Sequence, residues 1–209
     1  MSYDSQDAAW DEFYDQIREE LYPEHKEQAI EEFTEQKLKS YYQQNPDVMR
    51  PAVKAIHEGN WQLKQKRYSP ALVFYVTAIE LLFKATLLRP VLYGLIHNEG
   101  LAEIMTNSIL SQTGFERYEN LLAQLFDNLA NIDVKKITRE GMRDTLFVEC
   151  RNLQKIRNNI IHKGDFYTET DAEKGNLVSV AVFEKIVKPL LFSIGLCVED
   201  KGQIVERKN

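Results

Sequence analysis

Hydrophobic residues recur at every third or fourth position along most of the chain, which is the spacing of one face of an α-helix. These stripes predict helices over residues 47–66, 101–111, 115–131, 138–163 and 177–198. Residues 71–88 are apolar around nearly the whole helical circumference, and a helix of that kind is buried. The pattern therefore predicts an all-α fold with residues 71–88 at its centre.

Glycine, proline and polar residues predict where these helices begin and end. Ser69 is expected to cap the helix that starts with Pro70, and Gly164 to end the helix over 138–163 in a left-handed conformation. The chain after Pro90 is predicted to be less regular, and residues 165–176 to form a loop. Gly59 is expected to weaken the middle of the helix over 47–66.

The first 45 residues form a separate pattern. Aromatic and aliphatic side chains make two helical stripes that are interrupted by Pro23 and end at Asn45-Pro46; the stripes consist of Trp10, Phe13, Tyr14, Ile17 and Leu21, then Ile30, Phe33, Lys37 and Tyr41. The sequence therefore predicts an acidic helical hairpin over residues 1–45 as an appendage to a helical domain over 46–209.

Charge is distributed unevenly between these parts. The net charge is −6, but residues 1–36 contain 12 Asp and Glu against Arg18 and Lys26, which leaves 20 acidic and 24 basic side chains in the other 173 residues. The main domain is thus mildly basic. The acidic run has two interpretations: a solvated helical face, or a segment that covers a basic groove until a partner removes it.

Several classes of function are disfavoured by composition. Cys150 and Cys197 stand far apart in apolar helical contexts, and His25, His57 and His97 share no metal-ligand spacing, so no metal or other cofactor is expected. The chain opens without a basic-apolar-small signal, and charged residues interrupt its longest apolar stretches. A soluble protein of the cytoplasm is expected, without a membrane partner.

Arg157 and His162 are the candidate reactive pair. On a helical wheel, Arg157 lies in the same sector as Leu153 and Ile160, so it faces the core or a partner, whereas His162 is rotated from it by about 140°. Guanidinium and imidazole together suit phosphodiester cleavage, because imidazole titrates near neutral pH and guanidinium stays charged. On one rigid helix the two side chains do not converge. Two antiparallel copies related by a two-fold axis would bring each arginine toward the other copy's histidine.

The segment from Arg157 to His162, with Asn158 as the polar residue after the arginine, resembles the signature of the HEPN family. Residues 77–84, an apolar helix with an alanine and Glu80, resemble the helix that precedes the motif in that family. The two resemblances together span about residues 50–198. They imply a HEPN-like helical bundle, a homodimer, and a metal-independent ribonuclease with a composite site in the cleft between subunits. HEPN toxins commonly carry a tyrosine two residues after the histidine, where this chain has Gly164.

Other residues have supporting roles in this interpretation. Glu80 is expected to pair with Arg157 as the sole carboxylate of a buried helix, or with Lys84 alone; a Glu80–Arg157 pair could equally hold two helices in register. Asn158 would position the phosphate or the histidine. Three cations would attract RNA along the cleft, or else be ordinary solvated residues: Arg151, Lys155 and Lys163.

The preferred function is an endoribonuclease with an RNA substrate, acting as a toxin or an anti-phage defence effector with an antitoxin or a sensor protein as a further partner. The alternative is a non-catalytic HEPN-like helical module for protein–protein or nucleotide binding. An arginine within an apolar stripe favours the enzyme, because a scaffold gains little from a cation there.

Overall fold

The computed structural model describes residues 35–95 and 133–207, together with 100, 101, 104, 119, 120, 122 and 123. Contacts divide the chain into two units, Met1–Gln36 and Lys37–Asn209. Residues 1–34 of the predicted hairpin lie outside the described residues. Residues 37–44 are helical and belong to the second unit, where Leu38 and Tyr42 are buried in its core. The second unit therefore includes the last part of the segment predicted as an appendage.

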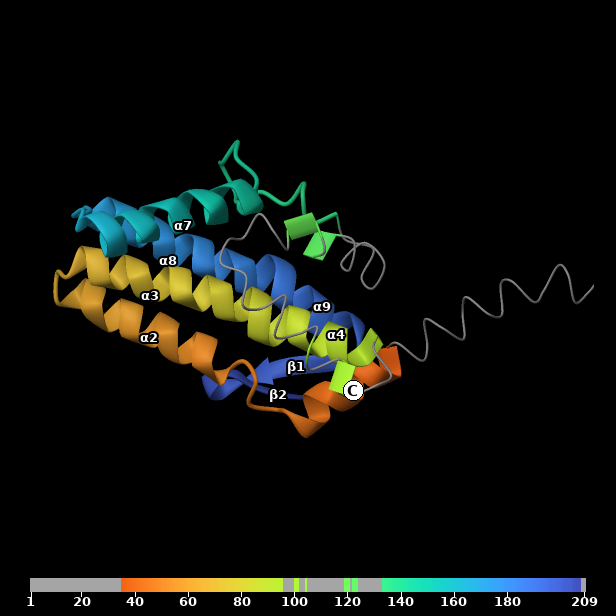
Figure 1. The fold of residues 1–209 in the computed structure, drawn as a ribbon. Coiled ribbons are helices and arrows are strands. Elements are labelled where there is room, and N and C mark those ends of the chain that lie inside the picture. Colours follow the sequence, from red (N-terminus) through yellow and green to blue (C-terminus); the bar gives the residue numbers. More distant parts are fainter. Residues whose placement is uncertain are drawn as a thin grey trace, which may run out of the picture. The chain divides into compact units, whose positions relative to one another are not determined.

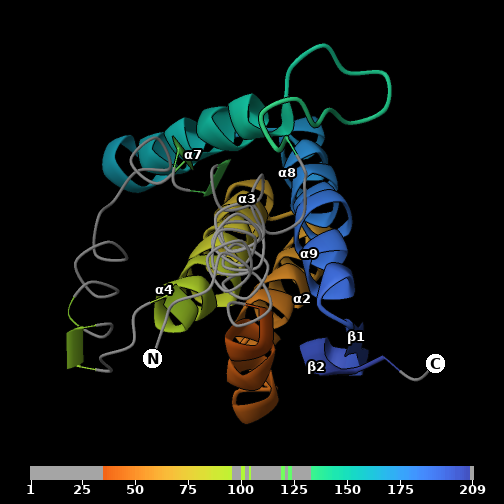
Figure 2. The ribbon, with the colours of Figure 1, turned by 90° about the vertical axis from the view of Figure 1, so that its right-hand side faces the viewer.

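The unit is mostly helical, and its centre is the helix that the sequence places there. Helix α3 (Tyr68–Leu81) packs against α2 (Arg50–Lys64), α7 (Leu146–Lys163) and α8 (Glu169–Val182). Figure 2 shows these three helices arranged around α3. Along α3, Leu72, Val76 and Ile79 are buried. The all-α class and the central position of residues 71–88 are confirmed.

Helix α2 approaches α3 through small residues. Its buried positions are Ala52, Ala55 and Gly59. A Cβ atom at Gly59 would lie 2.7 Å from Cε1 of Tyr75, so the glycine permits the close contact between the two helices. The expectation that Gly59 only weakens α2 therefore missed its packing role.

The central helix is longer than predicted and continues through Pro90. A π-helical segment, η1 (Leu82–Leu88), follows α3, and α4 (Arg89–Leu95) follows η1. Tyr68–Leu88 is long and apolar enough to cross a membrane by length and composition alone, and 61% of an 18-residue window within it is buried in this fold. Core helices share these properties.

The helix α3 also begins differently from the prediction. It starts at Tyr68, and no side chain caps it. The hydroxyl oxygen of Ser69 instead accepts a hydrogen bond from the backbone N–H of Tyr167, at 2.9 Å. Ser69 therefore joins two parts of the chain rather than closing its own helix.

Helix α7 begins eight residues later than predicted. Gly141 has a φ of +74°, Thr138 and Thr145 form an isolated β-bridge, and the N–H of Leu146 donates to the carbonyl of Ile137 at 2.8 Å. This closed turn replaces the first part of the predicted helix. The end of α7 at Gly164, in the left-handed conformation with φ of +72°, is confirmed.

Residues 165–176 are not the predicted loop, because α8 already begins at Glu169. Thr168 and Asp171 form a capping box in which each side chain accepts a hydrogen bond from the other residue's backbone N–H. A π-helical segment, η3 (Phe183–Val187), and α9 (Lys188–Ser193) continue this helix.

The chain then turns into a two-stranded hairpin where a helix was predicted to run on to residue 198. β1 (Leu196–Glu199) and β2 (Gln203–Glu206) are antiparallel, with Leu196 opposite Glu206 and Glu199 opposite Gln203. A 3₁₀ turn, η4 (Asp200–Gly202), connects them. Leu196 and Ile204 are buried, so the hairpin closes the lower side of the bundle beside α2 and α9 (Figure 1).

The predicted helices over 101–111 and 115–131 lie mostly outside the described residues. The seven residues between 100 and 123 that are described are helical, and Leu122 among them is fully buried.

Candidate functional site

Helix α7 carries the candidate motif on a helix with one firmly buried face. Its N-terminal half contributes Leu146, Phe147, Cys150 and Leu153 to the core. Towards the C-terminus the same face is less covered, because Ile160 is only partly buried and Ile161 is 49% exposed. The motif therefore lies on the part of α7 that is packed less tightly against the neighbouring helices.

Arg157 lies on the buried side of α7, as the helical wheel predicts, and is partly buried. Its Nε atom is buried and has no hydrogen-bond partner in the described part of the chain. Its Nη1 donates a long hydrogen bond of 3.4 Å to Oδ1 of the adjacent Asn158. A buried donor without an acceptor destabilises the fold by about 1–3 kcal/mol. Arg157 is thus a partly buried cation whose Nε atom has no acceptor among the described residues.

His162 is exposed in the last turn of α7. It follows Arg157 by five residues, which corresponds to a rotation of about 140° and a rise of about 7.5 Å along the helix. Among the described residues, no hydrogen bond joins the two side chains. The structure therefore does not bring Arg157 and His162 together within one chain, which is what their helical spacing predicts.

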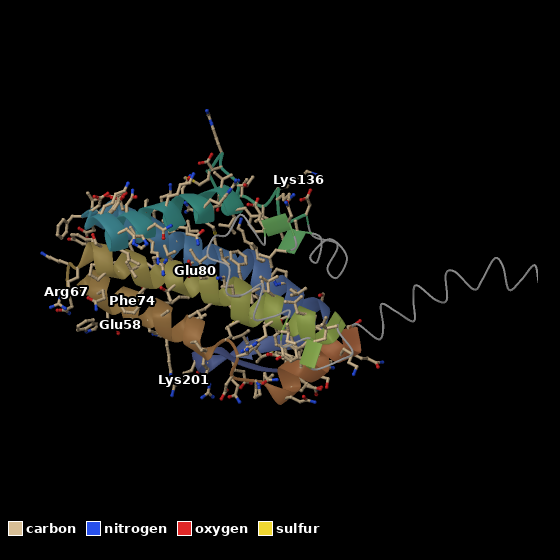
Figure 3. All side chains as sticks on the ribbon, viewed as in Figure 1. Glu58, Arg67, Phe74, Glu80, Lys136 and Lys201 are labelled. Atoms are coloured by element: carbon tan, nitrogen blue, oxygen red, sulfur yellow. The ribbon has the colours of Figure 1, made fainter. Side chains whose placement is uncertain are left out.

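Glu80 does not form either of the expected ion pairs. Its Oε1 atom accepts a hydrogen bond of 3.1 Å from Nε2 of Gln154, and the described residues contain no ion pair between Glu80 and Arg157 or Lys84. Figure 3 labels Glu80 on α3, on the side toward α7. Gln154 precedes Arg157 by three residues and is rotated from it by about 60°, so it faces Glu80 instead.

The other residues of α7 that the sequence assigned to RNA binding or support fall into two groups. Arg151 lies with its Nε atom 3.5 Å from Oε2 of Glu119, and both side chains are largely buried. Its charge is therefore already compensated. Lys155, Asn158 and Lys163 are exposed on α7 and remain accessible to a ligand.

Hydrogen bonds of Tyr167 fix the loop that follows the motif. The N–H of Tyr167 donates to Ser69, and Nδ2 of Asn159 lies 3.5 Å from the Tyr167 hydroxyl. Tyr167 thereby ties the end of α7 to the start of α3. No local sequence pattern singles out Tyr167, because its partner lies 98 residues away.

A buried ion pair holds the other end of α7. Arg139 donates from Nε and Nη2 to the two carboxylate oxygens of Glu149 at 2.8 and 2.6 Å, and Glu149 is 1% exposed. Hydrogen bonding to this carboxylate raises the pKa of Arg139. The pair was missed because a continuous helix over 138–163 would place the two residues almost three turns apart.

The described residues contain no cluster of three or more His, Cys, Asp or Glu side chains arranged to hold a metal ion. No protein family, characterised protein or solved structure matches the chain. The geometry of α7 and its surroundings is therefore the basis for the functional proposal.

Proposed function

We propose that this protein is a metal-independent endoribonuclease whose active site is shared between two subunits of a homodimer. The single observation that carries the proposal is the buried Nε of Arg157, which has no acceptor among the described residues. A phosphate oxygen would supply that acceptor, since guanidinium binds phosphate through charge-assisted hydrogen bonds. The resemblance of this segment to the HEPN motif supports the same reaction.

Two side-chain types suffice for the chemistry. A neutral imidazole takes the proton of a ribose 2′-hydroxyl, and the 2′-oxygen then attacks the adjacent phosphorus. Water gives a proton to the departing 5′-oxygen, and the protonated imidazole later returns its proton to solvent. Guanidinium stabilises the negative charge of the phosphorane between these steps. The products are a 2′,3′-cyclic phosphate and a 5′-hydroxyl end.

The dimer completes each site with a histidine from the other subunit. Arg157 and His162 are equally distant from the midpoint between Asn159 and Ile160 along α7. A two-fold axis at that midpoint, with the two α7 helices antiparallel, places Arg157 opposite the partner subunit's His162. The exposed Ile161 would be covered in this contact. Each composite site then contains an arginine and a histidine from different chains.

The proposal extends to a biological role as a toxin or an anti-phage effector of the cytoplasm, restrained by an antitoxin or a sensor protein. The acidic segment over residues 1–36 supports such restraint, because it would compete electrostatically with RNA for a basic surface. Deleting residues 1–34 and measuring cleavage tests this part: higher activity supports a shield, and unchanged activity of a folded protein contradicts it.

The enzymatic test is RNA cleavage in EDTA. We expect wild-type protein to cleave, and Arg157→Ala and His162→Ala each to lose activity while remaining dimeric. Undiminished cleavage by His162→Ala, or no cleavage by the wild type with the N-terminal segment removed, would contradict the proposal. Product ends should carry the cyclic phosphate.

Mixing the two inactive variants tests the composite site. After subunit exchange, half of the dimers contain one of each chain, and each of these has one intact site of two, so about a quarter of wild-type activity should return. A site within one chain cannot be restored in this way. Verified heterodimers without any recovery would therefore contradict the shared site but leave the reaction itself open to the first test.

A second candidate function is a non-catalytic module for binding proteins or nucleotides. The observation that favours it is the pair of exposed apolar side chains next to the motif, Ile161 and Phe166. Such a module would bind its partner without cleaving RNA, and binding would survive His162→Ala.

A further inference from the structure

Four helix ends meet beside His162. Helices α2 and α7 end on the same side of the bundle where α3 and α8 begin (Figure 1). The hydroxyl of Tyr68 donates to Glu169 at 3.1 Å, and the N–H of Tyr167 donates to Ser69. Leu63 of α2 packs on the small core formed by Ala71, Tyr75 and Ala172. The α2–α3 turn and the α7–α8 loop therefore lie next to each other.

Two aromatic side chains at this end are exposed, one almost fully and one by half. Phe166 is 94% exposed and Trp61 is 49% exposed. The guanidinium carbon of Arg67 lies 6.0 Å from the centre of the Trp61 ring, at the outer limit of a cation–π contact. The exposed parts of these rings are available for stacking.

The α2–α3 turn that follows Trp61 is basic. Lys64, Lys66 and Arg67 are all exposed. The turn has Schellman hydrogen bonds, from the N–H of Arg67 to the carbonyl of Gln62 and from the N–H of Lys66 to the carbonyl of Leu63, both at 2.9 Å. A lysine with φ of +58° stands where this motif favours glycine.

Lys66 presents its charge to solvent from an unfavourable backbone conformation. An L-residue in the left-handed conformation is disfavoured because its Cβ lies close to the following carbonyl oxygen. Lys201 is exposed and has the same conformation, so the strain alone assigns no role to either lysine. What distinguishes Lys66 is its place beside Arg67 and close to Trp61 in the α2–α3 turn.

We infer that Trp61, Lys66, Arg67 and Phe166 form a platform that binds single-stranded RNA and leads it to the composite site. A cation can bind the phosphate of a nucleotide while the adjacent exposed ring stacks on its base. Bases in a duplex are already stacked on each other, so the rings select unpaired RNA. Glu169 of α8 accepts a hydrogen bond from the Tyr68 hydroxyl. This inference rests on the proposed function and adds its substrate class.

Binding is measured without cleavage, so that the two proposals fail separately. The protein is His162→Ala combined with Trp10→Phe, because the chain has two tryptophans and Trp61 then becomes the only one. The probe is a short unstructured RNA that lacks a fluorophore. Stacking of a base on Trp61 should quench its fluorescence, and the same sequence as a duplex should bind at least tenfold more weakly.

Substitutions locate the platform. Trp61→Ala, followed by anisotropy of labelled RNA, should weaken binding about tenfold or more, whereas Trp61→Phe should retain most of it. Lys66→Gly should also weaken binding, although it relieves backbone strain. Lys201→Gly is the matched control, since Lys201 is exposed with φ of +63° and its neighbour Gly202 packs on Val53, near the opposite end of α2. Figure 3 shows Arg67 and Lys201 well apart.

Unchanged affinity in Trp61→Ala and Lys66→Gly, or equal losses in Lys66→Gly and Lys201→Gly, would overturn the inference. The absence of any RNA binding would overturn it as well and would assign the exposed rings to a protein partner. If the wild type cleaves short RNAs and these substitutions have no effect, the active-site proposal holds and the platform is contradicted.

Discussion

The hydroxyl of Tyr42 donates a hydrogen bond of 2.5 Å to the backbone carbonyl of Thr86, across 44 residues of chain. In an α-helix that carbonyl would accept from the N–H of the residue four positions later, which here is Pro90 and has no N–H. Tyr42 is fully buried. Thr86 lies in the π-helical segment η1, and the buried tyrosine gives its carbonyl a donor from outside that helix.

Tyr42→Phe should lower the free energy of unfolding by about 1–3 kcal/mol, because the Thr86 carbonyl is left buried without this donor. Urea denaturation followed by circular dichroism measures the change. Tyr41→Phe is the control, since the structure gives no hydrogen bond for the Tyr41 hydroxyl among the described residues and the side chain is only partly buried. Equal effects of the two substitutions would argue against the role of Tyr42.

Gly59→Ala should destabilise the protein by about 1–3 kcal/mol through overpacking against Tyr75. In a helix without such a neighbour the same change stabilises by about 0.5–1 kcal/mol, so the sign of the effect reports the contact. Gly175→Ala is the comparison, because its Cβ would lie at 3.3 Å from Cδ2 of Tyr75, and it should have a smaller effect. A higher urea midpoint for Gly59→Ala would contradict the close packing of α2 on α3.

The stability of the protein should fall at alkaline pH partly through Tyr75. Burial raises the pKa of Tyr75 from its ordinary value of 10.0 to about 12. The neutral phenol is thus favoured in the folded state, so its contribution is complete below pH 10 and is lost as the pH rises from 10 to 12.

Tyr75→Phe removes this ionisation and isolates its effect. The variant loses the 2.8 Å hydrogen bond from the Tyr75 hydroxyl to Asn60 and should be about 1 kcal/mol less stable at pH 8. Urea midpoints of the two proteins should converge between pH 10 and 12. Curves that stay parallel over this range would contradict the prediction.

Arg139→Met should destabilise the protein by about 3–5 kcal/mol, because it leaves Glu149 buried and unpaired. The double variant Arg139→Met/Glu149→Leu should recover most of that loss, since two apolar side chains can replace a buried ion pair. Lys188→Met is the control for an exposed pair with Glu184 and should cost less than about 1 kcal/mol. Thermal or urea unfolding distinguishes these cases, and a mild effect of Arg139→Met would mean that water reaches Glu149.

Arg157→Met should stabilise the protein by about 1 kcal/mol and abolish RNA cleavage, because it removes a buried donor that has no acceptor among the described residues. Opposite changes in stability and activity are the signature of a residue kept for function. Arg151 also has a buried Nε without a hydrogen-bond partner, but this atom lies 3.5 Å from Oε2 of Glu119, so Arg151→Met should lower stability by breaking that ion pair. A simultaneous loss of stability and activity in Arg157→Met would identify Arg157 as a structural residue.

Features determined by neighbouring residues could be predicted from the sequence. Gly164 ends α7 because glycine adopts the left-handed conformation readily, and Arg157 lies beside Leu153 because helical geometry fixes their relative rotation. The capping box of Thr168 and Asp171 follows an equally local rule, but it was overlooked, and a loop was predicted in its place.

Features determined by tertiary contacts could not be predicted in this way. The partner of Glu80 is Gln154 rather than Arg157, and choosing between them requires the axial placement of α7 on α3. The hairpin over residues 196–206 has strands of four residues each, too short for alternation to outweigh a helical interpretation. The late start of α7 depends on the ion pair between Arg139 and Glu149, which becomes recognisable only after the intervening turn has closed.

The two π-helical segments have an evolutionary consequence. The π-helical hydrogen bond spans five residues instead of four, so η1 and η3 each change the helical register relative to a continuous α-helix. The segments contact each other. Loss of one residue from η1 would rotate the part of the helix that follows it relative to η3. Homologues with a shorter η1 should therefore also have a shorter η3.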